Sequence, residues 1–298
     1  MSEADLPSDD ETGPGSAVDD ATTDRPETVL LTGCSSGIGR ATAAAFRAEG
    51  WTTYATARDP DDLTALADDG CHTAALDVTD DGDVARVVDR IADEQGRLDC
   101  LVNNAGYGQL GPMEDVPVET VHEQFDVNVY GPHRLTRAAL PVMREGDGGT
   151  VVNVSSVSGR VSTPGSGVYA GSKFALEAMS DALRGEVAPF DVNVVLVEPG
   201  PVDTGFQGRA TDSAERLPRT DAYDSLYEVI DDYGAIGGPG PASISPTAVA
   251  DAVVNAASCT DPAPRYPVGS LAKVTSLARF LPDRWRDRVY RLALRVLG

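Results

Sequence analysis

Lysine is almost missing from this chain. Its 298 residues contain two lysines, Lys173 and Lys273, and 22 arginines against 47 carboxylate side chains, so the formal net charge is −23 and the pI is near 4.3. Nucleic-acid binding requires a basic footprint, and this composition excludes it. Carboxylates in such excess repel one another unless salt screens them. Because arginine replaces nearly all lysine, the composition resembles that of proteins from salt-loving microbes, and we expect a halophilic source.

Long apolar runs and paired cysteines are missing as well. No stretch of about 18 apolar residues occurs, so no membrane span is expected. The N-terminus lacks the basic and then apolar pattern of a secretion signal. The four cysteines form no CxxC pair, which indicates buried or free thiols in a reducing compartment. The three histidines show no ligand spacing, so no metal site is expected. These absences together predict a cytoplasmic protein.

Composition divides the chain into three regions. Residues 1–26 are rich in Asp, Glu, Ser, Thr, Gly and Pro, and we expect them to form a disordered acidic tail. Residues 27–270 carry the apolar segments of one folded domain. Residues 271–298 predict a basic amphipathic helix, since from Arg265 onward eight lysines and arginines stand beside two aspartates. That helix can dock on the acidic body or on a second subunit, or it can lie on an anionic membrane surface.

Short apolar strands alternate with helical segments between residues 27 and 270. The strands are apolar throughout, which is typical of a parallel sheet covered on both faces. The pattern predicts a three-layered α/β fold with a Rossmann-type, doubly wound parallel sheet of about seven strands. The expected strands cover residues 27–33, 51–58, 72–78, 98–106, 150–156, 191–200 and 265–269, and the expected helices cover residues 40–50, 59–69, 80–96, 118–145, 167–188 and 247–258.

Residues 204–246 interrupt this alternation with a segment rich in glycine and proline. We expect it to be irregular, with a helix near residues 222–232. Because the segment follows the sixth strand, residues 204–240 are expected to form a lid over a ligand. Its apolar side chains either line a pocket or pack the lid on the body; they are Phe206, Leu217, Tyr223, Leu226, Tyr227, Ile230, Tyr233 and Ile236.

A glycine-rich turn joins the first strand to the first helix. Residues 32–39 read TGCSSGIG. Glycine permits the tight turn and lets backbone N–H groups at the helix start approach a pyrophosphate, so the turn predicts dinucleotide binding. The expected phosphate-binding residues are Gly33, Ser35, Ser36, Gly37, Ile38 and Gly39.

The ends of the second and third strands are expected to hold the adenosine. An acidic residue after the second strand suits a free ribose 2′-hydroxyl, whereas an arginine suits a 2′-phosphate. Arg58 stands there and favours NADP(H), although the adjacent Asp59 leaves NAD(H) open. After the third strand, Asp77 can bond the adenine amino group with Val78 against the ring, or Asp77 or Thr79 can cap the next helix.

Tyr169 and Lys173 stand four residues apart in VYAGSKFAL, within a predicted helix. Residues at this spacing share a helix face. A nearby ammonium favours the phenolate and lowers the pKa of a phenol from its ordinary value of about 10. Ser156 ends the fifth strand, at the edge where parallel sheets bind ligands. The three residues therefore predict an acid–base pair with a hydroxyl that can hold a carbonyl beside the phenol.

Several motifs occur together and in order: TGCSSGIG, NNAG at residues 103–106, the Asn128 of FDVNVYG, NVSS, YAGSK and EPGPVDT. From about residue 28 to residue 268 the chain resembles the single-domain, NAD(P)-dependent branch of the short-chain dehydrogenase/reductase family. The resemblance implies that Tyr169 is the general acid in carbonyl reduction and the base in alcohol oxidation. Lys173 would lower the pKa of Tyr169 and bind the nicotinamide ribose, Ser156 would orient the carbonyl, and Asn128 would hold a water that links Lys173 to solvent.

The same resemblance implies further cofactor contacts. The loop of Asn104, Ala105 and Gly106 would pass under the adenosine side and stabilise the central sheet. A second set, after the sixth strand, would lie along the nicotinamide and bond its carboxamide or the phosphates: Pro199, Gly200, Val202 and Thr204.

The predicted function is an NADP(H)-dependent oxidoreductase that interconverts a small-molecule alcohol and its carbonyl by hydride transfer. The segments YATARDP and VYAGSKFALEAMSDALR most resemble those of family members that act on lipophilic alcohols and ketones. The alternative is a non-catalytic, NADP(H)-sensing regulatory protein, against which the intact set of Ser156, Tyr169 and Lys173 speaks. The family also suggests a homodimer or homotetramer built from the long helices at 118–145 and 167–188.

Overall fold

The chain folds around one parallel sheet, as the alternation of strands and helices predicted. A computed structural model describes residues 26–236, 243–278 and 282–288. Within them, seven parallel strands are ordered β3-β2-β1-β4-β5-β6-β7. The order reverses between β1 and β4, and sheets of this kind bind ligands outside the strand carboxyl ends at that point. The strands are β1 (Thr28–Leu31), β2 (Thr52–Ala57), β3 (His72–Ala75), β4 (Cys100–Asn103), β5 (Gly149–Val154), β6 (Val192–Pro199) and β7 (Arg265–Val268).

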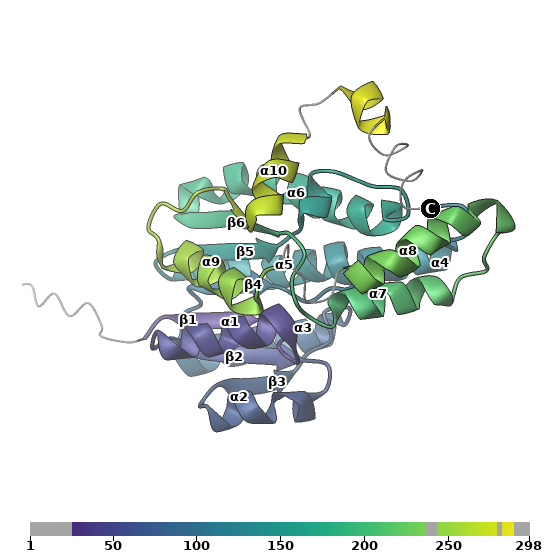
Figure 1. The fold of residues 1–298 in the computed structure, drawn as a ribbon. Helices are drawn as coiled ribbons and strands as arrows, with labels where there is room; N and C mark the ends of the chain where they lie inside the picture. Colours follow the sequence, from purple (N-terminus) through teal and green to yellow (C-terminus); the bar gives the residue numbers. More distant parts are fainter. Residues whose placement is uncertain (1–25, 237–242, 279–281, 289–298) are drawn as a thin grey trace, which may run out of the picture.

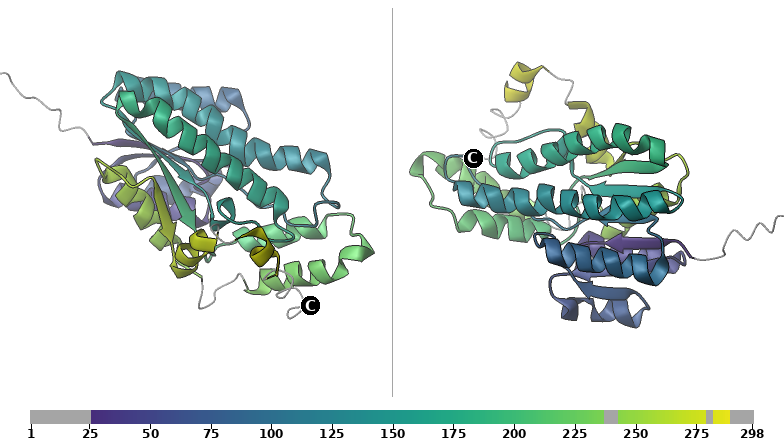
Figure 2. Two further views of the ribbon diagram at one scale, coloured as in Figure 1. Left: turned by 90° about the horizontal axis from the view of Figure 1, so that it is seen from above. Right: turned by 180° about the vertical axis from the view of Figure 1, so that it is seen from behind.

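Helices cover both faces of this sheet (Figures 1 and 2). On one face lie α1 (Gly37–Ala48), α2 (Thr64–Asp68) and α9 (Pro246–Ser258). On the other lie α3 (Asp81–Gln95), α5 (Gly131–Glu145) and α6 (Gly167–Val187), with α4 (Val118–Phe125) leading into α5. The three-layered Rossmann-type fold is thereby confirmed.

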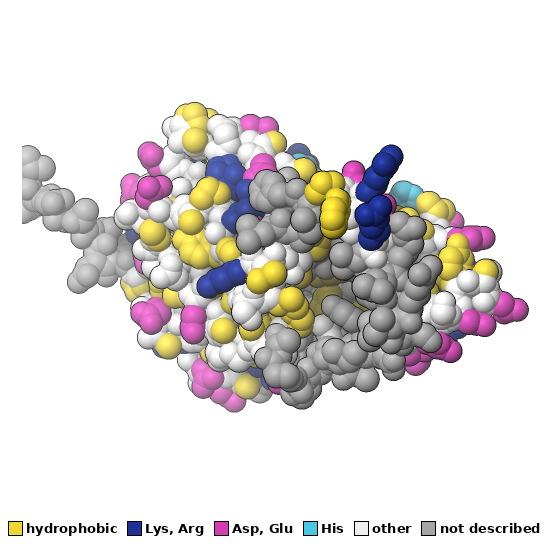
Figure 3. All heavy atoms as spheres, turned by 45° about the horizontal axis from the view of Figure 1, so that its top comes forward, with side chains coloured by type: hydrophobic (Ala, Val, Ile, Leu, Met, Phe, Trp, Pro, Cys, Tyr) yellow, Lys and Arg dark blue, Asp and Glu magenta, His cyan; other side chains and the backbone are white. Residues whose placement is uncertain are grey.

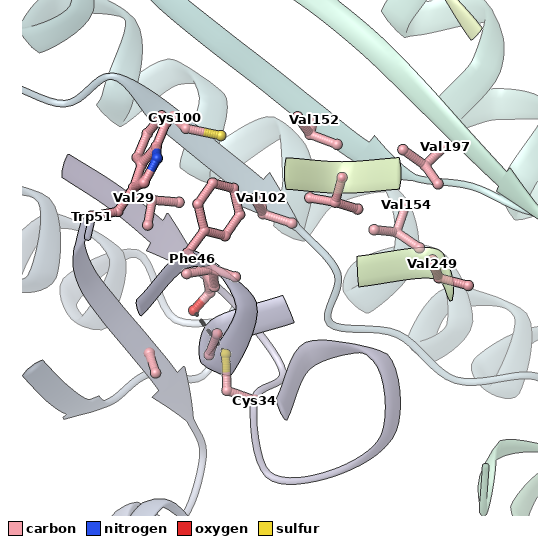
Figure 4. Packing of buried hydrophobic residues seen from close by; sticks show 14 of the residues in the cluster. Val29, Cys34, Phe46, Trp51, Cys100, Val102, Val152, Val154, Val197 and Val249 are labelled. Atoms are coloured by element: carbon pink, nitrogen blue, oxygen red, sulfur yellow. Dashed lines mark hydrogen bonds between the residues drawn. The ribbon is translucent and has the colours of Figure 1, made fainter. Parts of the chain in front are cut away.

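Two hydrophobic cores, one on each face, hold the layers together. Successive residues of a strand point to opposite faces, so Val29 and Leu31 of β1 enter one core and Leu30 enters the other. Figure 4 shows the first core, in which Phe46 of α1 lies among valines from the central strands. Burying a side chain of this size contributes about 1.5–3 kcal/mol. The sheet edge that carries the candidate site therefore rests on a well-packed base.

The helix expected at residues 118–145 contains a wider turn at its centre. Asp126–Tyr130 form a π-helical segment between α4 and α5. Single π turns inside α-helices are frequent at functional sites. Asn128, one of the expected site residues, lies in this turn and is buried.

The segment after β6 is more helical than the sequence predicted. Both α7 (Phe206–Glu215) and α8 (Asp224–Ile236) are helices, so the expectation of an irregular stretch around residues 206–215 was wrong. Helix α7 has no strong apolar stripe and buries only Ala210 and Ala214. It is held by tertiary contact, because Ala214 packs with Tyr227 and Ile230 of α8. Of the apolar side chains expected either to line a pocket or to pack, Tyr223, Leu226, Tyr227 and Ile230 pack in this cluster.

Asp115, in the loop after β4, anchors this pair of helices. Its carboxylate accepts hydrogen bonds from the backbone N–H and the hydroxyl of Thr220, at 3.1 and 2.6 Å, and from the hydroxyl of Tyr227 at 2.7 Å. These hydrogen bonds hold the pKa of the Asp115 carboxyl below its usual value, the bond from the Thr220 hydroxyl foremost. The segment of α7 and α8 is thus fastened to the loop that follows β4. Tyr233 and Ile236 carry side chains outside the described set.

The chain end forms two helical segments in the described residues rather than one. Helix α10 covers Ser270–Ala278, and a short helical segment covers residues 283–288, after Pro282 without regular structure. The acidic tail at residues 1–25 lies outside the described residues. No helix in the described ranges combines the length and the apolar content needed to cross a membrane.

The four cysteines are free thiols, as the sequence indicated. Three of them, Cys34, Cys71 and Cys100, are buried, and Cys259 is exposed. Burial raises the pKa of Cys34 to about 12, so this thiol stays protonated and unreactive beside the glycine-rich turn.

Candidate active site

The turn between β1 and α1 is shaped by its glycines. Gly33 and Gly37 adopt left-handed conformations with φ of 71° and 57°. A Cβ at Gly39 would lie 2.1 Å from the carbonyl oxygen of Gly33, which is backbone and cannot move aside. The turn therefore tolerates no larger residue at this position, and it leaves the backbone open to close approach.

The start of α1 offers unsatisfied N–H groups beside this turn. Ser36 occupies the N-cap position but makes no side-chain capping hydrogen bond. The first backbone N–H groups of a helix have no partner inside the helix, and together with the helix dipole they attract anions. The cradle thus fits the pyrophosphate of a dinucleotide. Ser35 lies at its rim, and Ile38 packs on the first hydrophobic core.

Asn104, directly after β4, ties this turn to the centre of the sheet. Its amide nitrogen donates to the carbonyl oxygens of Thr32 and Gly33, at 2.9 and 3.1 Å. The Thr32 hydroxyl in return accepts from the backbone N–H groups of Asn104 and Ala105. Two segments 71–73 residues apart are thereby interlocked. Gly106 continues the loop to Asn128, whose Oδ1 would lie 3.0 Å from a Cβ at Gly106.

An open depression of about 490 Å³ extends from the turn along the end of β2. It is lined by Ser35, Arg58, Asp59, Pro60 and Asp62. Among the described residues the guanidinium of Arg58 has no hydrogen-bond or ion-pair partner, and it is exposed. The Asp59 carboxylate, in contrast, accepts from the N–H of Asp61 at 3.0 Å and caps the short helix that follows. The Arg58 guanidinium is thus available to a ligand, whereas the neighbouring Asp59 carboxylate already accepts a hydrogen bond.

Asp77 and Val78 follow β3, and both already make contacts with neighbouring residues. One Asp77 oxygen accepts from the N–H and the hydroxyl of Thr79, at 2.9 and 2.7 Å. Val78 packs closely against Gly131 of α5, because a Cβ at this glycine would lie 2.8 Å from Val78 Cγ2. The alternative expectation of a helix cap is wrong for both Asp77 and Thr79, because Asp80 caps α3 by accepting from Asp83 N–H.

Tyr169 and Lys173 share one face of α6, one turn apart. The ammonium nitrogen of Lys173 lies 6.0 Å from the centre of the Tyr169 ring. Lys173 is only 6% exposed and donates a 2.9 Å hydrogen bond to the carbonyl oxygen of Val154, at the end of β5. Burial lowers the pKa of Lys173 to about 8, whereas the nearby charge of Glu177 acts to raise it. The lysine can therefore change its charge close to neutral pH.

Ser156 follows β5 with its hydroxyl proton available. Its Oγ accepts a 3.1 Å hydrogen bond from the N–H of Ser158 and so begins a short helical turn. No acceptor for its own O–H occurs among the described residues. A hydroxyl of this kind can still donate to a carbonyl oxygen.

Asn128 connects the loop after β4 to α6. Its amide nitrogen donates to the carbonyl oxygen of Tyr107 and to the hydroxyl of Ser172, at 2.9 and 3.1 Å, and its oxygen accepts from the N–H of Tyr107. The Ser172 hydroxyl in turn donates to the carbonyl oxygen of Tyr169. The water-holding role that the resemblance implies for Asn128 stays a prediction.

The residues after β6 return to the glycine-rich turn. Gly200 donates its N–H to Val268 of β7, and Val202 pairs with Ile244. Thr204 contacts the glycine-rich turn, since a Cβ at Gly37 would lie 3.0 Å from its Cγ2. Pro199 is buried at the end of β6. The loop after β6 and the glycine-rich turn are therefore neighbours.

Sequence reasoning placed Phe206 in the lid and missed its closeness to the acid–base pair. Its ring lies 5.6 Å from the ring of Tyr169. It also missed Glu177, one turn beyond Lys173 on α6, and Glu198 of β6, which are both buried. The only signal in the sequence was the continued spacing of four from Tyr169 through Lys173 to Glu177.

No group of three or more His, Cys, Asp or Glu side chains that could hold a metal ion occurs within residues 26–236, 243–278 and 282–288.

Residues 27–215 match the family model described as short chain dehydrogenase. The chain is 37% identical over 272 residues to an uncharacterised oxidoreductase of Escherichia coli, YbbO, covering 88% of this chain and 93% of that protein. It is 33% identical to the NADPH-dependent 3-dehydrocapnine reductase of Ornithobacterium rhinotracheale, covering 88% and 95%. It is 38% identical to retinol dehydrogenase 8 of Homo sapiens, covering 80% and 79%.

Solved structures show the same likeness. A short-chain dehydrogenase from Streptomyces avermitilis superposes with a TM-score of 0.78 at 34% identity, covering 90% of this chain and 96% of that one. A short chain dehydrogenase from Burkholderia cenocepacia, in complex with NADP, gives 0.69 at 25% identity, covering 89% and 98%. One from Burkholderia phymatum, in complex with NAD, gives 0.67 at 25% identity, covering 78% and 85%.

Proposed function

The chain belongs to the short-chain dehydrogenase/reductase family and is an oxidoreductase acting on CH–OH or carbonyl groups, and from this premise we propose that it uses NADP(H) to interconvert a secondary alcohol and a ketone, or a primary alcohol and an aldehyde. The single observation that carries the proposal is the placement of the Lys173 ammonium. It is buried at the carboxyl end of β5, one helix turn from Tyr169 and 2.9 Å from the carbonyl oxygen of Val154.

The chemistry of the site follows from three side chains. A nicotinamide dinucleotide, when bound, supplies or takes up the hydride. Tyr169 gives a proton to the carbonyl oxygen in reduction and takes one from the hydroxyl in oxidation. Lys173 favours the phenolate by its charge, and its low pKa of about 8 keeps the pair responsive near neutral pH. Ser156 donates its free O–H to the same substrate oxygen.

Removal of the phenol should abolish turnover and spare cofactor binding. We expect Tyr169→Phe to lower kcat about 10²–10⁴-fold, because it removes the general acid and leaves the ring in place. Turnover is followed at the nicotinamide absorbance in high salt, and NADPH binding by its fluorescence. Tyr130→Phe, at an exposed tyrosine of the π turn, is the matched control and should keep full activity. Substantial turnover in Tyr169→Phe would count against the assignment.

A lipophilic substrate is the finer part of the proposal. Retinol dehydrogenase 8 is among the relatives, and an apolar side chain stands beside the phenol. The ring of Phe206 lies 5.6 Å from the ring of Tyr169. Aldehydes and ketones of increasing chain length, assayed with the same wild-type protein, should show rising kcat/KM. A falling series would remove this part alone.

The preference for NADP(H) rests on the contrast between Arg58 and Asp59. Arg58 has an uncommitted guanidinium in the depression beside Ser35, whereas the Asp59 carboxylate is used as a helix cap. A guanidinium binds a phosphate by charge-assisted, two-point hydrogen bonds. An NADPH-dependent relative and a neighbour in complex with NADP support this preference, although a further neighbour was solved with NAD.

Arg58→Ala should therefore weaken the use of NADPH selectively. We expect the ratio of kcat/KM for NADPH over NADH to fall by roughly 10–100-fold, the loss of one charge-assisted contact. Arg86→Ala, an exposed arginine of α3 already paired with Asp83, serves as the control. If the ratio stays constant in Arg58→Ala and Asp59→Asn instead loses NADH-dependent turnover, Asp59 reads the ribose.

We also propose a halophilic, cytoplasmic homodimer or homotetramer. The net charge of −23 and the near-absence of lysine support the salt requirement. Exposed apolar side chains on α4 and α6, Val118 and Phe174 among them, support an interface between copies. The thermal midpoint should rise between dilute and molar salt, because salt screens the repulsion among carboxylates. Sedimentation of the same samples should give a dimer or tetramer; a salt-independent midpoint contradicts halophily, and a monomer contradicts the assembly.

The chain end is proposed to contact the acidic body or a second subunit, with a membrane surface as the rival. Val274 and Trp285 are 67% and 60% exposed and lie close in sequence to the exposed Lys273, Arg284 and Arg288. Figure 3 shows carboxylates around the rim of this face and basic and apolar side chains nearer its middle. Deletion of residues 282–298 should weaken assembly and leave the protein in the soluble cell fraction. Full-length protein that sediments with membranes only when this end is present would favour the rival.

A further inference from the structure

A stripe of ionisable side chains continues along α6 beyond the acid–base pair. Tyr169, Lys173, Glu177 and Asp181 follow one another at a spacing of four residues and therefore share one helix face. Lys173 and Glu177 are both buried, at 6% and 5% exposure, and Asp181 is exposed. The buried part of the stripe thus leads from the candidate site into the body of the protein.

A second buried carboxylate meets this stripe from the sheet. Glu198 of β6 is 2% exposed. Arg265 of β7 places Nη2 3.2 Å from a Glu177 oxygen and Nε 3.1 Å from Glu198 Oε1. Arg160, after β5, places Nη1 3.7 Å from Glu177 and Nε 3.8 Å from Glu198. Both carboxylates therefore face the same two guanidinium groups.

Hydrogen bonding inside this cluster is incomplete. Three of the eight buried side-chain atoms without a hydrogen-bond partner in the described part of the chain belong to it: Arg160 Nε, Glu177 Oε1 and Glu198 Oε1. Arg265 lies within ion-pair distance of Glu198, but its N–H groups point at Glu177 and Asp181. An ionised carboxylate offers only acceptors, whereas a protonated one also donates. When one carboxyl of the pair is protonated, its O–H can donate a hydrogen bond to an oxygen of the other.

Electrostatics favour the same arrangement. Burial raises the pKa of Glu198 to about 7, the charge of Glu177 acts in the same direction, and Arg160 and Arg265 act against both. Two buried carboxylates this close do not readily ionise together, and their protons belong to the pair. Glu198 can therefore hold a proton near neutral pH.

The pair is linked to Lys173 through Glu177. Glu177 opposes the effect of burial on the lysine, so it holds the pKa of Lys173 above the value that burial alone would set. Arg160, which follows η3 (Val157–Gly159), and Arg265 on β7 face the pair, and Asp181 and Arg184 lie next to it on α6. Helix α10, which carries the exposed Lys273, packs on β7 and η3. The charge of Glu177 is the one that acts on the pKa of Lys173.

We propose that Glu177 and Glu198 share one proton between Arg160 and Arg265, and that this carboxyl pair is a positioning element that sets the charge of Lys173. Its consequence for catalysis rests on the function proposed above: the pair then sets the pH range in which Tyr169 exchanges protons. The pair touches neither substrate nor cofactor in this account. It acts through the ammonium.

The chain offers a direct test, because it has two lysines. Protein labelled with carbon-13 at the lysine ε position and carrying Lys273→Arg has one lysine signal, that of Lys173. Its chemical shift against pH gives the titration midpoint of Lys173 without any turnover. Glu177→Gln should lower this midpoint by about one pH unit, since an opposite charge one turn away is removed. Glu198→Gln should lower it by less than half as much, and Asp181→Asn, further along the same face and exposed, should leave it unchanged.

The stability of Glu198→Gln is a second readout that needs no activity. The folded-state pKa of Glu198 is raised above the ordinary value of 4.5, so its contribution to stability is fully present below about pH 4.5 and is lost as the pH rises through about 7. The thermal midpoint of Glu198→Gln relative to the unsubstituted protein should therefore be higher at about pH 8 than at about pH 5. Asp181→Asn should show no such upward trend.

The outcomes separate this proposal from the proposed function. An unchanged Lys173 midpoint in Glu177→Gln, or a stability difference for Glu198→Gln that does not vary with pH, overturns the pair even if the protein reduces carbonyls. Midpoints that move as described, in a protein without turnover across the carbonyl panel, leave the pair standing and overturn the function. If both the carboxyl pair and the proposed function hold, the alkaline limb of kcat/KM for reduction should move to lower pH in Glu177→Gln. The movement should equal that of the Lys173 titration midpoint.

Discussion

The candidate site depends on one buried cation. The Lys173 ammonium is enclosed by protein, it is held by the carbonyl oxygen of Val154, and it stands one turn from Tyr169. A charge in such a place costs free energy unless partners compensate it, and the site supplies a backbone carbonyl and the carboxylate of Glu177. Burial outweighs this compensation and lowers the pKa of Lys173 to about 8, close to the pH at which a cell works. An arginine, which stays charged under all such conditions, lacks this property.

The remainder of the site is organised by close contact between backbones. Gly39 lies so near Gly33 that no side chain fits, and Asn104 bonds the same turn from the next strand along the sheet. These contacts hold the uncapped start of α1 at the reversal in strand order, where a parallel sheet offers its strand ends. The glycine-rich turn and the pair of Tyr169 and Lys173 are therefore held at one edge of the sheet, and the segment of α7 and α8 is fastened separately through Asp115.

Burying the carboxyl pair costs free energy, and a role in packing alone does not explain that cost. Isolated buried ion pairs are often no more stable than apolar side chains of similar volume. Here two carboxylates and two arginines occupy the space between α6, β6 and β7, with several polar atoms left without directed partners. The connection of this cluster to Lys173 gives it a use beyond packing, since a group that titrates near neutral pH can adjust its neighbour.

The sequence by itself determined what depends on local spacing. The alternation of apolar strands and helices was enough for the parallel sheet, and the spacing of four between Tyr169 and Lys173 was enough for their shared helix face, because both are properties of neighbouring residues. Tertiary structure decided the rest. Helix α7, which has no strong apolar stripe of its own, packs through Ala214 on Tyr227 and Ile230 of α8. Glu177, Glu198, Arg160 and Arg265 come from four segments, and their mutual distance, on which the charge of each depends, exists only once the sheet has brought those segments together.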